Sequence, residues 1–112
     1  MPEQTENPVI VSMTPEAFET LGEGFCGSDL VLKFLKAIQL RMVPPQLVVD
    51  QEIPDDAPTE IKNALGKGEG KSWRIAVGHR GHATFLQWYE SPEGNFVIVW
   101  NMQHPVEVVT EE

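Results

Sequence analysis

The sequence predicts an α+β domain in which helices pack on one face of an antiparallel sheet of about four strands. Three observations lead to this prediction. Residues 71–102 have the pattern of a three-stranded meander, residues 29–42 have the periodicity of one main helix, and one or two shorter segments carry helix signals. Residues 47–49 supply the fourth strand.

The meander is indicated by its residue types and its turns. Apolar and polar side chains alternate along residues 71–78, and aromatic and β-branched types dominate residues 83–89 and 96–100. Turn signals at residues 78–81 and 91–95 separate the three segments. Loops this short join antiparallel neighbours, and four-residue loops predict that Val77 pairs with His82 and Glu90 with Asn95.

This register divides the side chains between two apolar faces, and a one-residue bulge would swap them. The first face carries Trp73, Ile75, Val77, Thr84, Leu86, Trp88, Val97 and Val99. The second carries Phe85, Tyr89, Phe96, Ile98, Trp100 and Met102, with Arg74 and Gln87 among them. One main helix covers only one side of a small sheet, so the second face needs the short helices, a second subunit or a partner.

The main helix is predicted over residues 29–42, with Ser28 and Asp29 as its cap and Pro44 and Pro45 as its stop. Its apolar stripe consists of Val31, Phe34, Leu35, Ile38 and Met42. A first short helix starts at Thr14 and ends at Gly22 or Gly24, and a second runs over residues 59–65. Residues 8–12 and 106–109 could add further short strands.

The length and composition indicate one globular domain over residues 1–112, with a disordered tail at 1–7 and a frayed end at 110–112. The net charge of −9 opposes binding to nucleic acid or to an anionic membrane, so neither is predicted as a partner. A single cysteine, Cys26, and the lack of an apolar run of about 18 residues favour a cytoplasmic protein.

Two short motifs fail as catalytic or cofactor sites. Residues 66–72 resemble a phosphate loop in composition, but Leu65 stands where the first glycine would be needed and a strand follows instead of a helix. Cys26 precedes the main helix, where the helix dipole could activate it, yet no partner histidine is placed beside it. No cofactor is predicted, and a small buried residue is the favoured interpretation of Cys26.

Three histidines, His79, His82 and His104, are predicted near one end of the sheet, where they could hold a zinc ion. No carboxylate is placed as a fourth ligand or as an outer partner. Solvated turn histidines are therefore favoured over a metal site, and no metal is predicted.

The acidic connector contains Asp50, Glu52, Asp55, Asp56 and Glu60. Its spacing does not fit an EF-hand calcium loop, because Asp55 stands where glycine is needed. A solvated charge run and a contact with a basic partner both remain open.

The leading hypothesis is a small acidic protein that acts through protein contact, as an inhibitor, immunity factor, adaptor or assembly subunit. It rests on the lack of a coherent catalytic set, the second apolar face and the acidic first half of the chain. A homodimer or a complex with another protein, possibly one with a basic surface, is expected. The predicted partner-binding residues are Phe85, Phe96, Ile98, Trp100, Met102, Asp50, Glu52, Asp55 and Asp56.

The alternative is a small-ligand-binding protein or enzyme with a cleft over the sheet, lined by Trp88, Trp100, Arg74 and His82. Replacement of Trp100 separates the two hypotheses. If the second face binds a partner, Trp100→Ala should weaken association more than folding.

Overall fold

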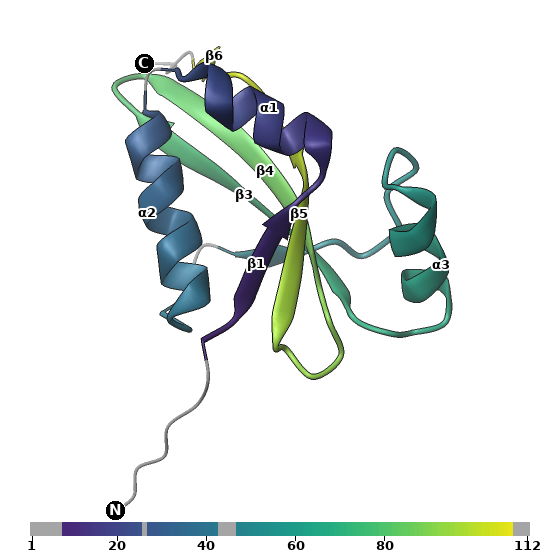
Figure 1. The fold of residues 1–112 in the computed structure, drawn as a ribbon. Coiled ribbons are helices and arrows are strands. Elements are labelled where there is room, and N and C mark those ends of the chain that lie inside the picture. The colour runs from purple at the N-terminus through teal and green to yellow at the C-terminus, as the bar shows by residue number, and fades with distance from the viewer. Residues whose placement is uncertain (1–7, 26, 43–46, 109–112) are drawn as a thin grey trace, which may run out of the picture.

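The computed structural model describes residues 8–25, 27–42 and 47–108, and in this part of the chain a mixed sheet carries helices on both faces (Figure 1). The strands are β1 (Ile10–Met13), β2 (Val48–Val49), β3 (Lys71–His79), β4 (His82–Glu90), β5 (Phe96–Met102) and β6 (Val106–Glu107). The helices are α1 (Pro15–Glu23), α2 (Ser28–Gln39) and α3 (Thr59–Gly66). Cys26 and the predicted tails at 1–7 and 110–112 lie outside the described residues.

The sheet has six strands in the order β1, β5, β4, β3, β2, with β6 beside β4. The α+β class is confirmed, but the prediction of a purely antiparallel sheet of about four strands is wrong. The prediction that the helices pack on one face is wrong as well, because α3 packs on the other. β1 pairs with β5 in parallel, from Ile10 opposite Phe96 to Met13 opposite Val99. This pairing joins segments more than 80 residues apart in the sequence, so no local turn pattern could indicate its direction.

The β3–β4 hairpin is tighter than predicted. Its turn consists of Arg80 and Gly81 alone, both with positive φ (53° and 82°), as a two-residue turn of this kind requires. His79 pairs with His82, so Val77 pairs with Thr84 and not with His82. The shift is two residues, which leaves every side chain of this hairpin on its predicted face.

A β-bulge at Trp100 changes the faces at the end of β5. Trp88 pairs with Val99, whereas Gln87 pairs with Asn101, so Trp100 is the extra residue. Trp100 and Asn101 therefore both point to the second face, and Met102 moves to the first, opposite Leu86. The prediction that Met102 lies on the second face is wrong for this reason.

The two helices on the first face follow their sequence signals with two corrections. α2 begins at Ser28 with Gly27 as its N-cap and no side-chain cap hydrogen bond, so the predicted cap by Ser28 and Asp29 is wrong. In α1 the Thr14 side chain accepts a hydrogen bond from the backbone N–H of Ala17 (3.3 Å), as expected of an N-cap. α2 ends at Gln39, before the predicted Met42, because the chain enters a left-handed conformation at Arg41 (φ 62°). Met42 is thus 67% exposed and does not belong to the buried stripe.

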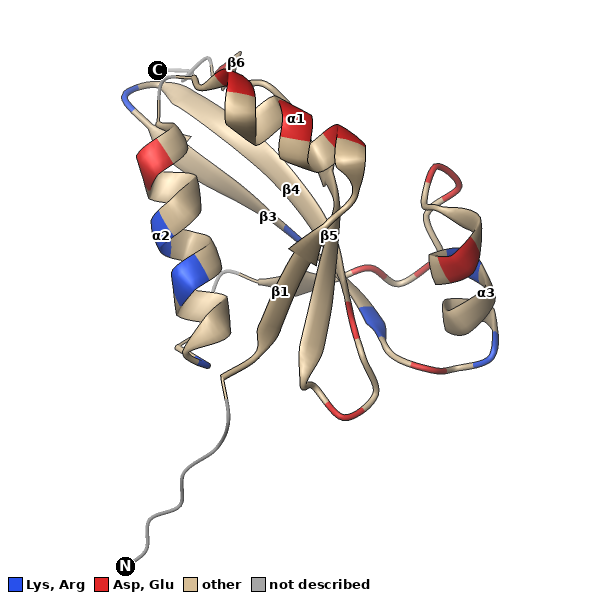
Figure 2. Ribbon diagram, in the orientation of Figure 1, with Lys and Arg blue, Asp and Glu red and all other residues tan. Residues whose placement is uncertain are grey.

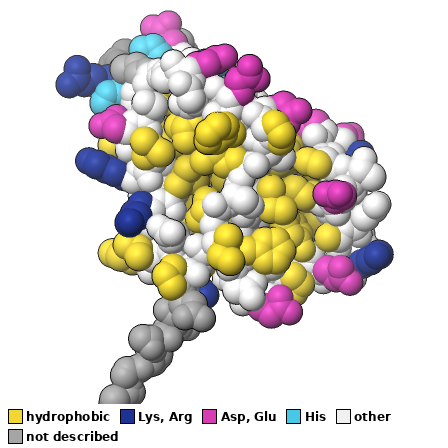
Figure 3. All heavy atoms as spheres, in the orientation of Figure 1, with side chains coloured by type: hydrophobic (Ala, Val, Ile, Leu, Met, Phe, Trp, Pro, Cys, Tyr) yellow, Lys and Arg dark blue, Asp and Glu magenta, His cyan; other side chains and the backbone are white. Residues whose placement is uncertain are grey.

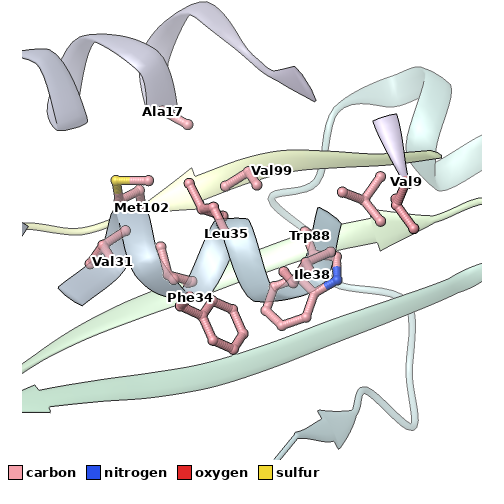
Figure 4. Packing of buried hydrophobic residues seen from close by; sticks show 11 residues of the cluster. Val9, Ala17, Val31, Phe34, Leu35, Ile38, Trp88, Val99 and Met102 are labelled. Carbon is pink, nitrogen blue, oxygen red and sulfur yellow. The ribbon is translucent and has the colours of Figure 1, made fainter. Parts of the chain in front are cut away.

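The main core lies between these helices and the first face of the sheet (Figure 4). The ring of Phe34 meets the ring of Trp88 edge-on, with centroids 5.4 Å apart. The predicted stripe of α2 is confirmed for Val31, Phe34, Leu35 and Ile38, all of them buried. The buried members of this core are Val9, Ala17, Val31, Phe34, Leu35, Ile38, Leu86, Trp88, Val97, Val99 and Met102.

A second, smaller core lies on the opposite face, beneath α3. Ala57 and Ile61 pack there against Tyr89 and Trp100. The Tyr89 hydroxyl donates a hydrogen bond to the backbone oxygen of Glu69 (2.7 Å), which fastens the loop after α3 to the sheet. The chain itself therefore covers one half of the second face, and the other half stays open.

Candidate functional site

The open half of the second face forms a hollow of about 580 Å³, which we call the sheet hollow. Its apolar wall includes Val48, Ala76 and Phe85, and Val48 and Phe85 are 44% and 41% exposed. Its polar wall consists of Arg74, Gln87, Asn101 and Gln103. The hollow thus offers exposed apolar surface beside fixed hydrogen-bonding groups, the composition of a binding site.

The bulge at Trp100 shapes the floor of the sheet hollow. It places Asn101 on the same face as Gln87, and Asn101 Nδ2 donates a hydrogen bond to Gln87 Oε1 (2.7 Å). Within the described chain, Gln87 Nε2 and Asn101 Oδ1 have no hydrogen-bond partner. One donor and one acceptor therefore remain side by side on the sheet surface.

Arg74 is held in place by Asp50 at one rim of the hollow. Arg74 Nε lies 3.1 Å from Asp50 Oδ1, and the Ser72 hydroxyl donates to Asp50 Oδ2 at 2.9 Å. The Asp50 side chain is only 9% exposed, whereas the Arg74 side chain is 58% exposed. Asp50 therefore positions Arg74 and is not itself an open contact for a partner.

A second hollow of about 390 Å³, the acidic hollow, adjoins the first. The two share Arg74 and Gln87, and the acidic hollow is further lined by Asp50, Glu52 and Asp55 from the connector between β2 and α3. Figure 2 shows acidic residues along this connector. With Asp50 paired to Arg74, the carboxylates of Glu52 and Asp55 leave a net negative charge beside the apolar wall.

The structure separates the predicted partner-binding residues into three groups. Phe85, Glu52 and Asp55 line the two hollows, and Asp56 is exposed on the same connector. Trp100 and Met102 are buried in the two cores and offer no surface. Ile98 is partly buried against the second core beneath α3, and the ring of Phe96 lies beside Tyr89, with centroids 6.3 Å apart.

Phe96 is 37% exposed and pairs with Ile10 of β1, which is 68% exposed. Hydrophobic side chains reach the surface over α1 and between β5 and α3 in the view of Figure 3, with acidic side chains around them. Phe96 and Ile10 do not line the sheet hollow and so belong to a separate area of the surface.

The residues of the predicted ligand cleft do not converge. Trp88 is buried on the opposite face against Phe34, and Trp100 lies beneath α3. His82 is at the β3–β4 turn. Of the four, Arg74 alone lines the sheet hollow.

The histidines likewise do not gather around one point. His79 pairs with His82 across the hairpin, whereas His104 Nε2 lies 2.7 Å from Glu23 Oε1 and its ring contacts Phe25. Throughout the described residues, no group of three or more His, Cys, Asp or Glu side chains is arranged to hold a metal ion.

Sequence reasoning placed Arg74 and Gln87 on the second face but missed Asn101, Gln103 and Val48 as site residues. The signal available was the presence of carboxamide side chains in strands otherwise rich in aromatic and β-branched residues. The position of Asn101 depends on the bulge, which the strand pattern does not reveal.

Comparisons of the chain with protein-family models, curated proteins and solved structures give no match. Among the described helices, none combines the length and apolar character that crossing a membrane requires.

Proposed function

We propose that this protein is a binding module that docks on another protein with a basic surface, as an inhibitor, immunity factor, adaptor or assembly subunit. The observation that carries the proposal is the pair of hollows that share Arg74 and Gln87. The sheet hollow exposes Phe85 and Val48, and the acidic hollow is lined by Glu52 and Asp55. An apolar centre with a charged rim is the usual make-up of a protein interface. The proposal includes a cytoplasmic location, which rests on the single cysteine in the sequence.

The charge of the chain favours a different protein over a second copy as the partner. Each chain carries a net charge of −9, so two copies repel each other, and contact through the acidic hollow would bring like charges together. A basic partner would be attracted by the same field. A hetero-complex is therefore proposed in preference to the homodimer.

A small ligand is the second candidate occupant. The volume of about 580 Å³ falls in the range of small-molecule sites, and Arg74, Gln87, Asn101 and Gln103 supply convergent polar groups. The residues of this site differ from those of the predicted ligand cleft, with Arg74 in common.

Affinity capture from the native lysate with matched variants tests the proposal. Phe85→Glu places a charge in the sheet hollow, and Phe18→Glu places the same charge on α1, where Phe18 is 67% exposed on the other side of the sheet. We expect one stoichiometric protein to be retained by the wild type and by Phe18→Glu and to be lost with Phe85→Glu. Retention by Phe85→Glu, or the absence of a protein partner, would contradict the proposal.

A further inference from the structure

We infer that the two hollows together receive one extended segment of the partner, in which an apolar side chain fills the sheet hollow and a nearby lysine or arginine enters the acidic hollow. This inference rests on the proposed function and specifies its ligand. It follows from the continuity of the hollows, their different chemistry, and the donor of Gln87 and acceptor of Asn101 that their mutual hydrogen bond leaves free.

The continuity comes from shared walls. Arg74 and Gln87 line both hollows, so a single ligand that passes over these two residues reaches both. In an extended chain, side chains two residues apart point to the same side at a separation of about 6.5 Å. Neighbouring side chains of one short segment can therefore occupy the two hollows at once.

The apolar subsite is defined by Val48, Ala76 and Phe85. A lysine or arginine placed against these residues would lose hydration and would meet the like charge of Arg74 on the wall of the same hollow. An aliphatic or aromatic side chain would remove the exposed surface of Val48 and Phe85 from water. The sheet hollow thus selects an apolar residue.

The acidic subsite selects a cation. Asp50 is already paired with Arg74, and Lys62 Nζ donates to the backbone oxygen of Asp55 (3.1 Å), which leaves the carboxylates of Glu52 and Asp55 to interact with a ligand. Carboxylates bind guanidinium or ammonium groups through charge-assisted hydrogen bonds. Arg74 itself would repel a cation placed beside it, so the basic side chain is expected at the Glu52 and Asp55 end of the hollow.

The amide groups favour an extended segment over a helix. Gln87 Nε2 can donate to a backbone carbonyl, and Asn101 Oδ1 can accept from a backbone N–H. In the middle of a helix these backbone groups are already bonded to each other, whereas an extended segment presents them to its surroundings.

Selection from a library of random linear peptides displayed on phage tests the inference, with the full chain as the target. We expect the selected peptides to carry a lysine or arginine within about three residues of an apolar side chain. Their dissociation constants would then be measured by fluorescence anisotropy against the wild type and two charge-matched double variants. Glu52→Gln with Asp55→Asn changes the acidic hollow, whereas Glu16→Gln with Glu19→Gln removes the same charge from α1.

The acidic-hollow variant should raise the dissociation constant about fivefold, and the α1 variant less than about twofold. Replacement of the basic residue of the peptide by glutamine should cause a similar loss. The glutamine-substituted peptide and the acidic-hollow variant combined should raise the dissociation constant no more than either change alone, because both remove the same contact.

Three other outcomes would overturn the inference. If the peptides lack basic residues, or both double variants act alike, the acidic hollow does not select a cation. The proposed function then still stands if Phe85→Ala weakens binding. If no peptide is selected but the captured partner depends on Phe85, the ligand is a folded surface. If neither a peptide nor a partner depends on Phe85, the proposed function fails as well.

Discussion

Gly70 and Gly68 lie two residues apart, and both have positive φ, 102° and 75°. Their surroundings differ. A Cβ atom at Gly70 would lie 2.4 Å from the backbone oxygen of Glu90 and 2.5 Å from Tyr89 Cε1, whereas a Cβ at Gly68 would meet nothing within 4 Å. Gly70 is therefore required both for its backbone conformation and for the close approach of the loop to Tyr89.

Gly70→Ala should lower the free energy of unfolding by about 2–5 kcal/mol, because a left-handed alanine costs about 1–2 kcal/mol and overpacking adds about 1–3 kcal/mol. Gly68→Ala, the control, should cost about 1–2 kcal/mol from its backbone alone. Urea unfolding of both variants measures the difference. Equal losses would show that the loop moves away from Tyr89 without cost.

Tyr89 links stability to alkaline pH. Burial, with smaller contributions from the charges of Glu69 and Glu93, raises the pKa of the Tyr89 phenol above its ordinary value of 10.0. The folded state thus disfavours the phenolate, while the unfolded chain ionises normally. The stabilisation is complete below about pH 10 and is lost as the pH rises through the higher pKa of the folded state.

Replacing Tyr89 by phenylalanine should remove this dependence, together with the hydrogen bond to Glu69. The wild type should lose more stability than Tyr89→Phe between about pH 9 and pH 11, although the variant starts from a lower value near neutral pH. Denaturant titrations at several pH values make this comparison. If the free energies of unfolding of the two proteins fall in parallel as the pH rises, ionisation of Tyr89 does not contribute to the alkaline loss of stability.

At the scale of elements, α3 differs from α1 and α2 in how it is attached. α1 and α2 share one core with eleven buried members, whereas the core under α3 has four. Trp100 is the largest residue of that second core, and its indole N–H has no hydrogen-bond partner in the described chain. An unpaired buried donor costs about 1–3 kcal/mol of folding free energy. The apolar packing that holds α3 on the sheet is therefore partly offset by the unpaired indole N–H of Trp100.

Trp100→Ala should therefore destabilise the fold by about 3–5 kcal/mol and loosen α3 selectively. This replaces the expectation that the change acts mainly on association, because Trp100 is buried beneath α3. Hydrogen exchange should show faster exchange in residues 57–70 than in β4 and β5. Phe34→Ala in the main core is the control, and it should accelerate exchange on the α1 and α2 side instead.

At the scale of the whole molecule, the net charge of −9 and the acidic hollow oppose self-association. Sedimentation equilibrium at physiological ionic strength should therefore give the mass of a single chain. A stable dimer that dissociates on Phe85→Glu would instead identify a second copy as the occupant of the sheet hollow.

The same field should steer the basic partner towards its site. Asp55→Asn with Asp56→Asn should slow association and flatten its dependence on salt, because salt screens exposed charges over about 8 Å at physiological ionic strength. The dissociation rate should change less. Glu16→Gln with Glu19→Gln is the control, because it changes the net charge equally but on α1. A smaller effect of this control on the association rate would show that the charges of the connector act locally.

Features that depend only on neighbouring residues could be predicted from the amino-acid order. The period of two in β3 and β4 and the stripe from Val31 to Ile38 assigned side chains to their faces correctly, because backbone geometry repeats over short distances. The exposed position of Phe85 and the acidity of the connector were also available from it. These local patterns predicted an apolar second face, but they did not predict that α3 covers part of it.

Which residues of the second face stay exposed depends on tertiary packing. Local patterns contain no information about the parallel partner of β1, the bulge that turns Met102 inward or the docking of α3 on Trp100. Each of these depends on the free energy of packing segments that are distant in the sequence. That packing covered the middle of the second face and left the hollow around Phe85 open, and the bulge placed Asn101 beside Gln87 within it.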